Sequence, residues 1–151
     1  MKKSINYSEQ TMVTEFCNTY LSNKQIRFSV EVPFFDKSID LVYLVNNKYY
    51  AIEFKLNNWK KAIEQAKNHM IGADYIYICL PSNKKYNENE LENELKKNNC
   101  GLLLFDVKER KVYSKIKPKR NKSVIKRGKE RLINGFNYSI ANDNFNLLTT
   151  I

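Results

Sequence analysis

The chain has 151 residues, of which 42% are hydrophobic and 13% aromatic, so it can bury a core and is not an intrinsically disordered polymer. Lysine and arginine number 26 against 16 acidic residues, and the net charge of +10 favours a polyanionic partner such as nucleic acid. Three isolated cysteines form no disulfide or zinc pattern, and no signal peptide or membrane-spanning apolar run is present, so we expect a cytoplasmic protein without a membrane partner.

The first two predicted elements are a helix and a strand. Residues 8–21 place their apolar side chains at helical spacing, with Glu15 beside the apolar face. Residues 25–33 alternate apolar and polar side chains, which indicates a strand with Glu31 on its polar side. Asp36 follows in the connection to the next strand, and either acidic residue could approach a site formed further along the chain.

The next element is a predicted β-hairpin. Two apolar-rich runs, residues 39–45 and 49–54, are joined at Asn46 and Asn47. Because asparagine tolerates positive φ, this pair is typical of a tight hairpin turn.

Charged residues are set into this hairpin at one end. Asp40 opens the first strand, and Glu53 and Lys55 close the second. Side chains alternate along a strand, so Glu53 and Lys55 share a face, and the hairpin brings Asp40 beside them. Two adjacent carboxylates suit Mg²⁺, and a lysine next to them can stabilise negative charge on a phosphate. The pattern therefore predicts metal-assisted phosphodiester hydrolysis, with an exposed surface pair as the alternative.

An aspartate followed across a hairpin by Glu-x-Lys resembles the core motif of the PD-(D/E)XK nuclease superfamily. Asp40 would be the metal-binding aspartate, Glu53 the second carboxylate and Lys55 the catalytic lysine. The resemblance implies that Mg²⁺ or Mn²⁺ binds to these carboxylates and to the backbone carbonyl of Phe54. Ile39 stands where the family usually has proline.

The resemblance covers roughly residues 9–81 and implies a restriction-endonuclease-like α/β fold. Its αβββαβ core would contain a mixed central sheet flanked by helices. In this family a glutamate on the first helix often completes the acidic cluster, so Glu15 is the expected additional site residue. Whether Glu31 or Asp36 joins the metal site stays open.

Residues 59–72 are predicted to form the second core helix, with Gln65 and His69 one turn apart on the shoulder of its apolar stripe. Part of the nuclease superfamily carries Gln-x-x-x-Tyr on this helix; Gln65 matches, and His69 replaces the tyrosine. Gln65 would orient Lys55 or the scissile phosphate, and His69 would contact the nucleic acid. The alternatives are a solvated glutamine and a packed histidine.

The rest of the core is predicted to add strands and a helix. Residues 74–80 are predicted to form a buried strand, parallel to the second hairpin strand because a helix connects the two. Residues 88–97 predict a short helix, and residues 102–107 and 111–116 predict a further strand pair.

We predict a core domain over residues 1–117 and a basic C-terminal extension over residues 118–151, packed on or beside that core. Residues 124–133 can form a short basic helix, and residues 136–151 could form an edge strand or contact a partner. The expected nucleic-acid contacts are cations near the second helix and in the extension, besides His69: Lys60, Lys61, Lys119, Arg120, Lys126 and Arg127.

The leading interpretation is therefore a magnesium-dependent nuclease, with DNA expected as the substrate rather than RNA. Cutting both strands of a duplex with one small site would call for a homodimer. The alternative is a non-catalytic nucleic-acid-binding or interaction module of the same fold, in a repair or defence complex. A basic transcription factor is a weaker alternative because no helix-turn-helix pattern is evident.

Overall fold

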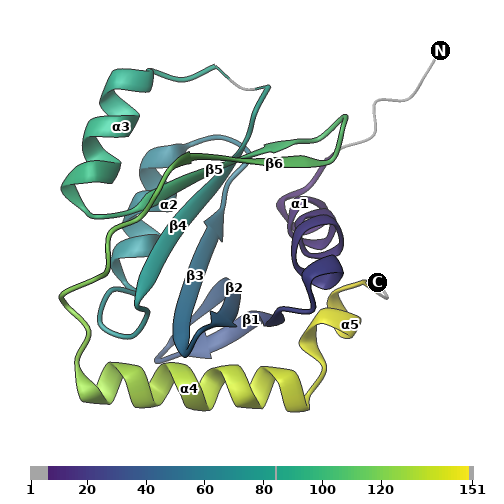
Figure 1. Cartoon of the computed structure of the whole chain (residues 1–151), viewed down its shortest axis with the longest axis vertical. Coiled ribbons are helices and arrows are strands. Elements are labelled where there is room, and N and C mark those ends of the chain that lie inside the picture. The colour runs from purple at the N-terminus through teal and green to yellow at the C-terminus, as the bar shows by residue number, and fades with distance from the viewer. Residues whose placement is uncertain (1–6, 84, 150–151) are drawn as a thin grey trace.

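Six strands form one mixed sheet in the order β1-β2-β3-β4-β5-β6 (Figure 1). The structure is a computed structural model and describes residues 7–83 and 85–149. Strands β3, β4 and β5 are parallel, and the other neighbours are antiparallel. The strand bounds are β1 Arg27–Phe34, β2 Lys37–Val45, β3 Lys48–Phe54, β4 Tyr75–Pro81, β5 Gly101–Asp106 and β6 Lys111–Ile116.

The predicted order of helix, three strands, helix and strand is confirmed, as is the α/β class with a mixed sheet flanked by helices. The first helix ends earlier than predicted and continues as a π-helical turn at Cys17–Leu21 and a 3₁₀ turn at Ser22–Lys24. The α-helix bounds are α1 Glu9–Phe16, α2 Trp59–Lys67, α3 Glu88–Lys97, α4 Lys126–Ala141 and α5 Asn144–Thr149.

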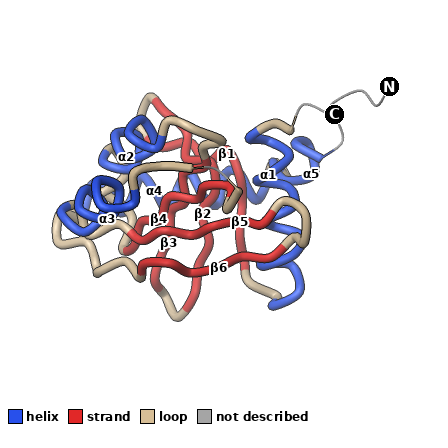
Figure 2. The backbone as a smooth tube through the Cα atoms, turned by 90° about the horizontal axis from the view of Figure 1, so that it is seen from above, coloured by secondary structure: helices blue, strands red, loops and turns tan. Residues whose placement is uncertain are grey.

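Helices cover both faces of the sheet, and each face has its own apolar core (Figure 2). On one face, α2, α3 and α4 pack over side chains that include Val42, Ala51 and Ile78. On the other face, α1 packs over Ile52 and Phe54, with α5 beside it. Successive side chains of β3 point to opposite faces, with Ala51 in the first core and Ile52 and Phe54 in the second, so Glu53 points to the face covered by α2 and α4.

The hairpin turn between β2 and β3 is confirmed, because Asn46 and Asn47 both have positive φ, at 52° and 62°. Glu31 also has a left-handed conformation, with φ of 49°, and it interrupts the pairing of β1 with β2. The β1–β2 ladder runs through Val30 and resumes at Val32, so Glu31 lies opposite Asp40 without pairing to it.

The C-terminal residues form helices. Helix α4 packs against β1 through a buried face that includes Leu132 and Phe136, and α5 follows after a short turn. The expectation of an edge strand within residues 136–151 is therefore wrong for the described residues up to 149. No described helix has the length and apolar character needed to cross a membrane.

Candidate active site

The β2–β3 hairpin brings Asp40 and Glu53 together. Leu41 pairs with Ile52 in the antiparallel register, so positions 40 and 53 face each other where the ladder ends. The N–H of Phe54 donates to Oδ2 of Asp40 at 2.9 Å, and each carboxyl affects the pKa of the other. We call Asp40 and Glu53 the carboxylate site.

Both carboxyls resist ionisation in this position. Burial and the adjacent charge of Glu53 raise the pKa of Asp40 to about 8. Burial also raises the pKa of Glu53 to about 7, although the hydrogen bond with Asp40 and the charge of Lys55 act in the opposite direction. The pair therefore retains a proton at neutral pH, and a cation that binds between the carboxyls would replace it.

His69 lies against Glu53 from the turn that follows α2. Its Nε2 is 2.5 Å from Oε1 of Glu53, and the two residues are 1% and 3% exposed. Burial lowers the pKa of His69 to about 4, although the charge of Asp40 opposes the shift. The imidazole is thus neutral at pH 7, and its Nε2–H donates a hydrogen bond to Oε1 of Glu53. A side chain this buried cannot touch nucleic acid, so the prediction that His69 binds substrate is wrong, and its contact assigns it to positioning Glu53.

Lys55 lies just beyond β3, beside the carboxylate site, where its charge favours the ionised form of Glu53. Its Nζ is 3.7 Å from Oε1 of Glu9, and the N–H of Leu56 donates to the other oxygen of Glu9 at 3.3 Å. The charge of Glu9 also contributes to the raised pKa of Asp40. Glu9 therefore links the start of α1 to both the lysine and the carboxylates.

Glu15, the expected additional site residue, has its hydrogen-bond partner elsewhere, and Glu9 is the glutamate of α1 that contacts Lys55. The carboxylate of Glu15 accepts a hydrogen bond from the hydroxyl of Tyr7 at 3.0 Å, whereas Glu9 reaches the site because α1 meets the end of β3 with its amino-terminal turn. The sequence carried a signal for this residue, since Ser8 caps the helix and places Glu9 in its first turn.

Glu31 is a third carboxylate near Asp40. Burial and the charge of Asp40 raise the pKa of Glu31, and the hydroxyl of Ser38 donates to its Oε2 at 3.2 Å. Asp36 lies in the exposed β1–β2 turn, and no hydrogen bond or ion pair joins it to Asp40 within the described ranges.

Three of the predicted site residues lie on α2: Gln65, Lys60 and Lys61. Gln65 has a buried Oε1 that finds no hydrogen-bond partner within residues 7–83 and 85–149, so this oxygen accepts no bond from Lys55. The other expected role of Gln65, orienting the scissile phosphate, stays a prediction. Lys60 is exposed and pairs with Glu90 of α3 at 3.0 Å. Lys61 is also exposed.

The cations of the C-terminal extension lie away from the carboxylate site. Arg120 and Lys126 line a pocket around Asp74, just before β4 and at the start of β3, whereas Glu53 is near the end of β3. Lys119 directly precedes this pocket wall, and Arg127 is exposed in the first turn of α4.

The donor set of the carboxylate site fits Mg²⁺ or Mn²⁺. One oxygen of Asp40 is held by the Phe54 N–H and one oxygen of Glu53 by His69, which leaves an oxygen of each carboxyl for a cation. In the described part of the chain, no three His, Cys, Asp or Glu side chains form a ready-made metal cluster. Two carboxylates nevertheless suffice for Mg²⁺, which retains waters and shares substrate phosphates.

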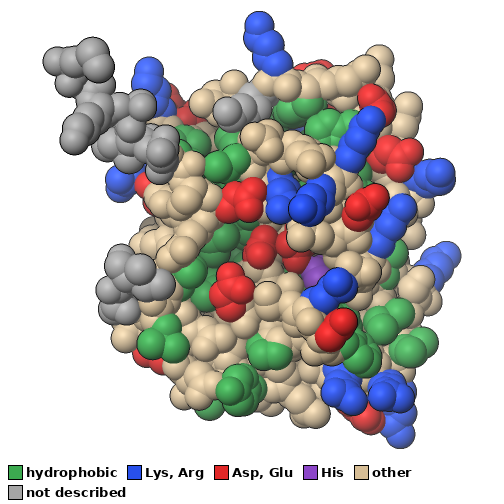
Figure 3. Space-filling model, turned by 180° about the vertical axis from the view of Figure 1, so that it is seen from behind, with side chains coloured by type: hydrophobic (Ala, Val, Ile, Leu, Met, Phe, Trp, Pro, Cys, Tyr) green, Lys and Arg blue, Asp and Glu red, His purple; other side chains and the backbone are tan. Residues whose placement is uncertain are grey.

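Figure 3 shows the molecule from behind, with acidic side chains gathered around the histidine near the middle of the face and lysine and arginine side chains around them. The acidic side chains visible on this face are therefore surrounded by cationic ones.

Comparisons with known proteins identify no family for this chain and one weakly similar solved structure. No protein-family model matches the chain, and no curated protein matches it. Among solved structures, the chain is similar to an fdxN element excision controlling factor protein from Anabaena variabilis, with 12% identity and a TM-score of 0.42. That match covers 68% of this chain and 97% of the other.

Proposed function

We propose that this protein is a metal-dependent nuclease of the PD-(D/E)XK type that hydrolyses phosphodiester bonds, with DNA as its expected substrate. The proposal rests on one observation above all: the β2–β3 hairpin places Asp40 opposite Glu53, with Lys55 beside them just beyond the end of β3. Keeping two carboxyls and a lysine crowded together costs stability, and metal-assisted hydrolysis gives them a role. The order of core elements agrees with the resemblance to that family.

Asp40 and Glu53, with the backbone carbonyl of Phe54, would hold Mg²⁺ or Mn²⁺. The bound ion would lower the pKa of a coordinated water and neutralise charge on the phosphate. His69 keeps one oxygen of Glu53 occupied, so Glu53 presents its other oxygen in a fixed orientation.

Lys55 supplies the positive charge that stabilises the phosphate as negative charge develops on it during attack. Glu9 holds the lysine near the carboxylates, and its hydrogen bond to the Leu56 N–H fixes the chain just beyond β3. Because Lys55 is only 17% exposed, its ammonium acts from one side of the site rather than from open solvent.

The second candidate function is a non-catalytic nucleic-acid-binding module. It is favoured by the position of the C-terminal cations, which gather around Asp74 rather than at the carboxylate site. Such a module would bind nucleic acid with a strong salt dependence and would cut nothing.

The test is incubation of plasmid, linear duplex, single-stranded DNA and RNA with the protein and Mg²⁺ or Mn²⁺, with EDTA as the control. Glu53→Ala and Lys55→Ala proteins are assayed in parallel. We expect metal-dependent cutting that both substitutions abolish. Cutting that persists in both variants would mean that the activity belongs to another protein, and salt-sensitive binding without cutting would favour the binding module.

A further inference from the structure

A pocket of about 700 Å³ lies at the start of β3, at the opposite end of that strand from Glu53. Its lining carries five cationic side chains against a single carboxylate, that of Asp74. We call it the basic pocket, and its cations are Lys48, Arg120, Lys122, Lys126 and Lys129.

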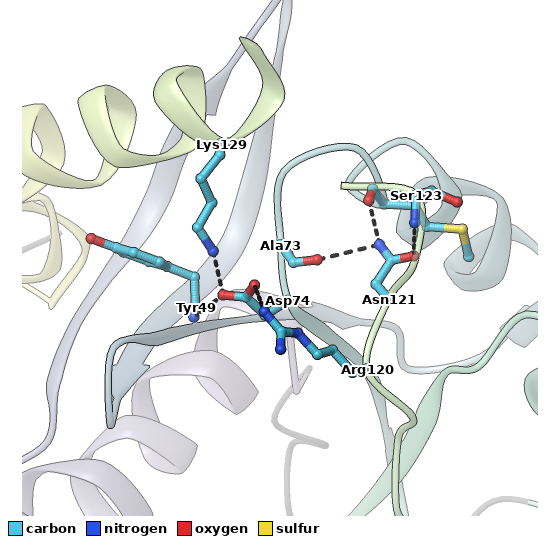
Figure 4. Close-up of polar contacts among 8 residues, drawn as sticks. Tyr49, Ala73, Asp74, Arg120, Asn121, Ser123 and Lys129 are labelled. Atoms are coloured by element: carbon cyan, nitrogen blue, oxygen red, sulfur yellow. Dashed lines mark hydrogen bonds and ion pairs between the residues drawn. The ribbon is translucent and has the colours of Figure 1, made fainter. Parts of the chain in front are cut away.

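Asp74 is already fully engaged within the protein. It is 4% exposed; its Oδ2 accepts the N–H of Tyr49 at 2.8 Å and pairs with Lys129, and its Oδ1 is 4.0 Å from Arg120 (Figure 4). One carboxylate therefore offsets one of the five positive charges. The other three lysines of the basic pocket form no ion pair with any described residue.

The wall of the basic pocket is held in place although it belongs to no helix or strand. The side-chain amide of Asn121 donates hydrogen bonds to the backbone carbonyls of Met70 and Ala73 (Figure 4). The backbone N–H of Asn121 donates to the backbone carbonyl of Asp74 at 2.7 Å. The side-chain oxygen of Asn121 accepts the N–H of Ser123 at 3.2 Å. Backbone positions on both sides of Lys122 are thus fixed, which lowers the entropy lost when the pocket binds a ligand.

Helix α4 begins at the pocket in an arrangement that is unfavourable without an anion. Its first turn carries Lys126 and Arg127 and no acidic residue, and the capping residue Ile125 offers no side-chain acceptor. The amino-terminal end of a helix has positive potential, so these cations are repelled there, whereas an anion is attracted both to the helix and to the cations. The helix end and the unpaired lysines are separate observations that favour the same kind of ligand.

We propose that the basic pocket binds a phosphate group of a nucleic-acid strand at a distance from the bond that is cut. Tyr49, which contacts Asp74, and Glu53 are four residues apart on β3, or about 13 Å at strand spacing. A single phosphate cannot reach both sites. The pocket therefore anchors the strand while the carboxylate site acts on another phosphate, and the identity of that strand as substrate rests on the proposed function.

The test is nucleic-acid binding by an Arg120→Gln, Lys122→Gln double variant in EDTA. Both side chains are exposed, so the fold is expected to survive, and Lys129 is left intact because it pairs with buried Asp74. The matched control removes the same two charges from the β5–β6 turn, as Lys108→Gln with Arg110→Gln. Fluorescence anisotropy with a labelled duplex and a labelled single strand is recorded over a range of salt concentrations.

We expect the pocket variant to bind about tenfold or more weakly at low salt. Its salt slope should be smaller by about one for each phosphate that the protein no longer neutralises. The control should bind close to the wild type. Equal affinities and slopes for the pocket variant and the control would overturn the proposal.

Oligonucleotides with a 5′-phosphate or a 5′-hydroxyl distinguish the source of the phosphate. Equal binding of the two indicates an internal backbone phosphate, and a preference for the 5′-phosphate that the pocket variant loses indicates a strand end. The proposed function can fail independently of this inference. If the protein binds nucleic acid through the basic pocket but does not cut it, the pocket proposal stands and the nuclease proposal is wrong. If the protein cuts nucleic acid and the pocket variant binds it as tightly as the wild type, the nuclease proposal stands and the pocket proposal is wrong.

Discussion

Nε2 of His69 lies 2.5 Å from Oε1 of Glu53, although the two residues come from different elements, the turn after α2 and strand β3. Both side chains are buried, and Nδ1 of the imidazole has no hydrogen-bond partner in the described part of the chain. The contact fixes one oxygen of the glutamate and ties the end of α2 to the sheet.

Replacing His69 tests this positioning role. His69→Ala should reduce metal affinity and cleavage about 10–100-fold, because Glu53 loses the donor that orients it. The same change should lower the free energy of unfolding by about 1–3 kcal/mol, since it leaves a buried carboxyl oxygen unsatisfied.

His69→Gln serves as the matched variant, because its amide can still donate to Glu53. It should recover part of the metal affinity measured by calorimetry. A purely structural histidine would show equal loss of stability in both variants with no change in metal affinity.

Stability without metal should fall as the pH rises from about 6.5 to 8.5. An acid whose folded pKa is raised binds its proton more tightly when folded, so its contribution is complete below the unfolded pKa and is lost as pH rises through the folded pKa. For Glu53 and Asp40 that loss extends up to about 7 and about 8. His69 has the opposite sign, since its lowered pKa removes stability only as pH falls below about 6.5, so the histidine does not contribute to the decline above that pH.

Melting temperatures measured across this pH range check the prediction, at about 2–4 °C per kcal/mol for a chain of this size. Asp40→Asn should flatten the decline, and Asp36→Asn, in the exposed turn, should leave it unchanged. A wild-type melting temperature that rises over this range would contradict the shared proton at the carboxylate site.

Metal should stabilise the protein more strongly at high pH than at low pH. Protons and the cation compete for Asp40 and Glu53, so Mn²⁺ added at pH 8 should raise the melting temperature, and the same addition at pH 5 should have little effect. Asp40→Asn should abolish the increase. An equal increase in wild type and variant would place the bound metal elsewhere.

The docking of α4 depends on a glycine. A Cβ at Gly135 would lie 1.9 Å from the carbonyl oxygen of Pro33 in β1, so Gly135→Ala should lower the free energy of unfolding by about 1–3 kcal/mol. At an exposed helix position, a glycine-to-alanine substitution raises the free energy of unfolding by up to about 1 kcal/mol. A decrease for Gly135→Ala would therefore identify the close contact with Pro33. Asn134→Ala, at the exposed neighbouring position, should change stability by about 0.5 kcal/mol or less in urea unfolding.

The sequence predicted best those features of the fold that depend on residues close together in the chain. Paired asparagines marked the β2–β3 turn, and the helix between two buried strands indicated their parallel order; both are present. The meeting of Asp40 and Glu53 followed from that turn, because a two-residue hairpin fixes which positions face each other.

Features that depend on how elements meet could not be predicted in the same way. An apolar stripe indicates which side of α1 is buried, but not that its first turn abuts the end of β3, where Glu9 contacts Lys55 and the Leu56 N–H. Helix α4 carried a usable signal, since Leu132, Phe136 and Ile140 recur at intervals of four. The asparagine-rich composition around them obscured that period.

The central claim is tested most directly by single-turnover cleavage at pH 8 with Mn²⁺, comparing wild type, Glu53→Gln and Glu15→Gln. The two substitutions remove the same charge, but only Glu53 belongs to the carboxylate site. We predict that Glu53→Gln cuts about 100-fold more slowly or not at all, whereas Glu15→Gln cuts at close to the wild-type rate. A Glu53→Gln protein that cuts as fast as the wild type would contradict the account.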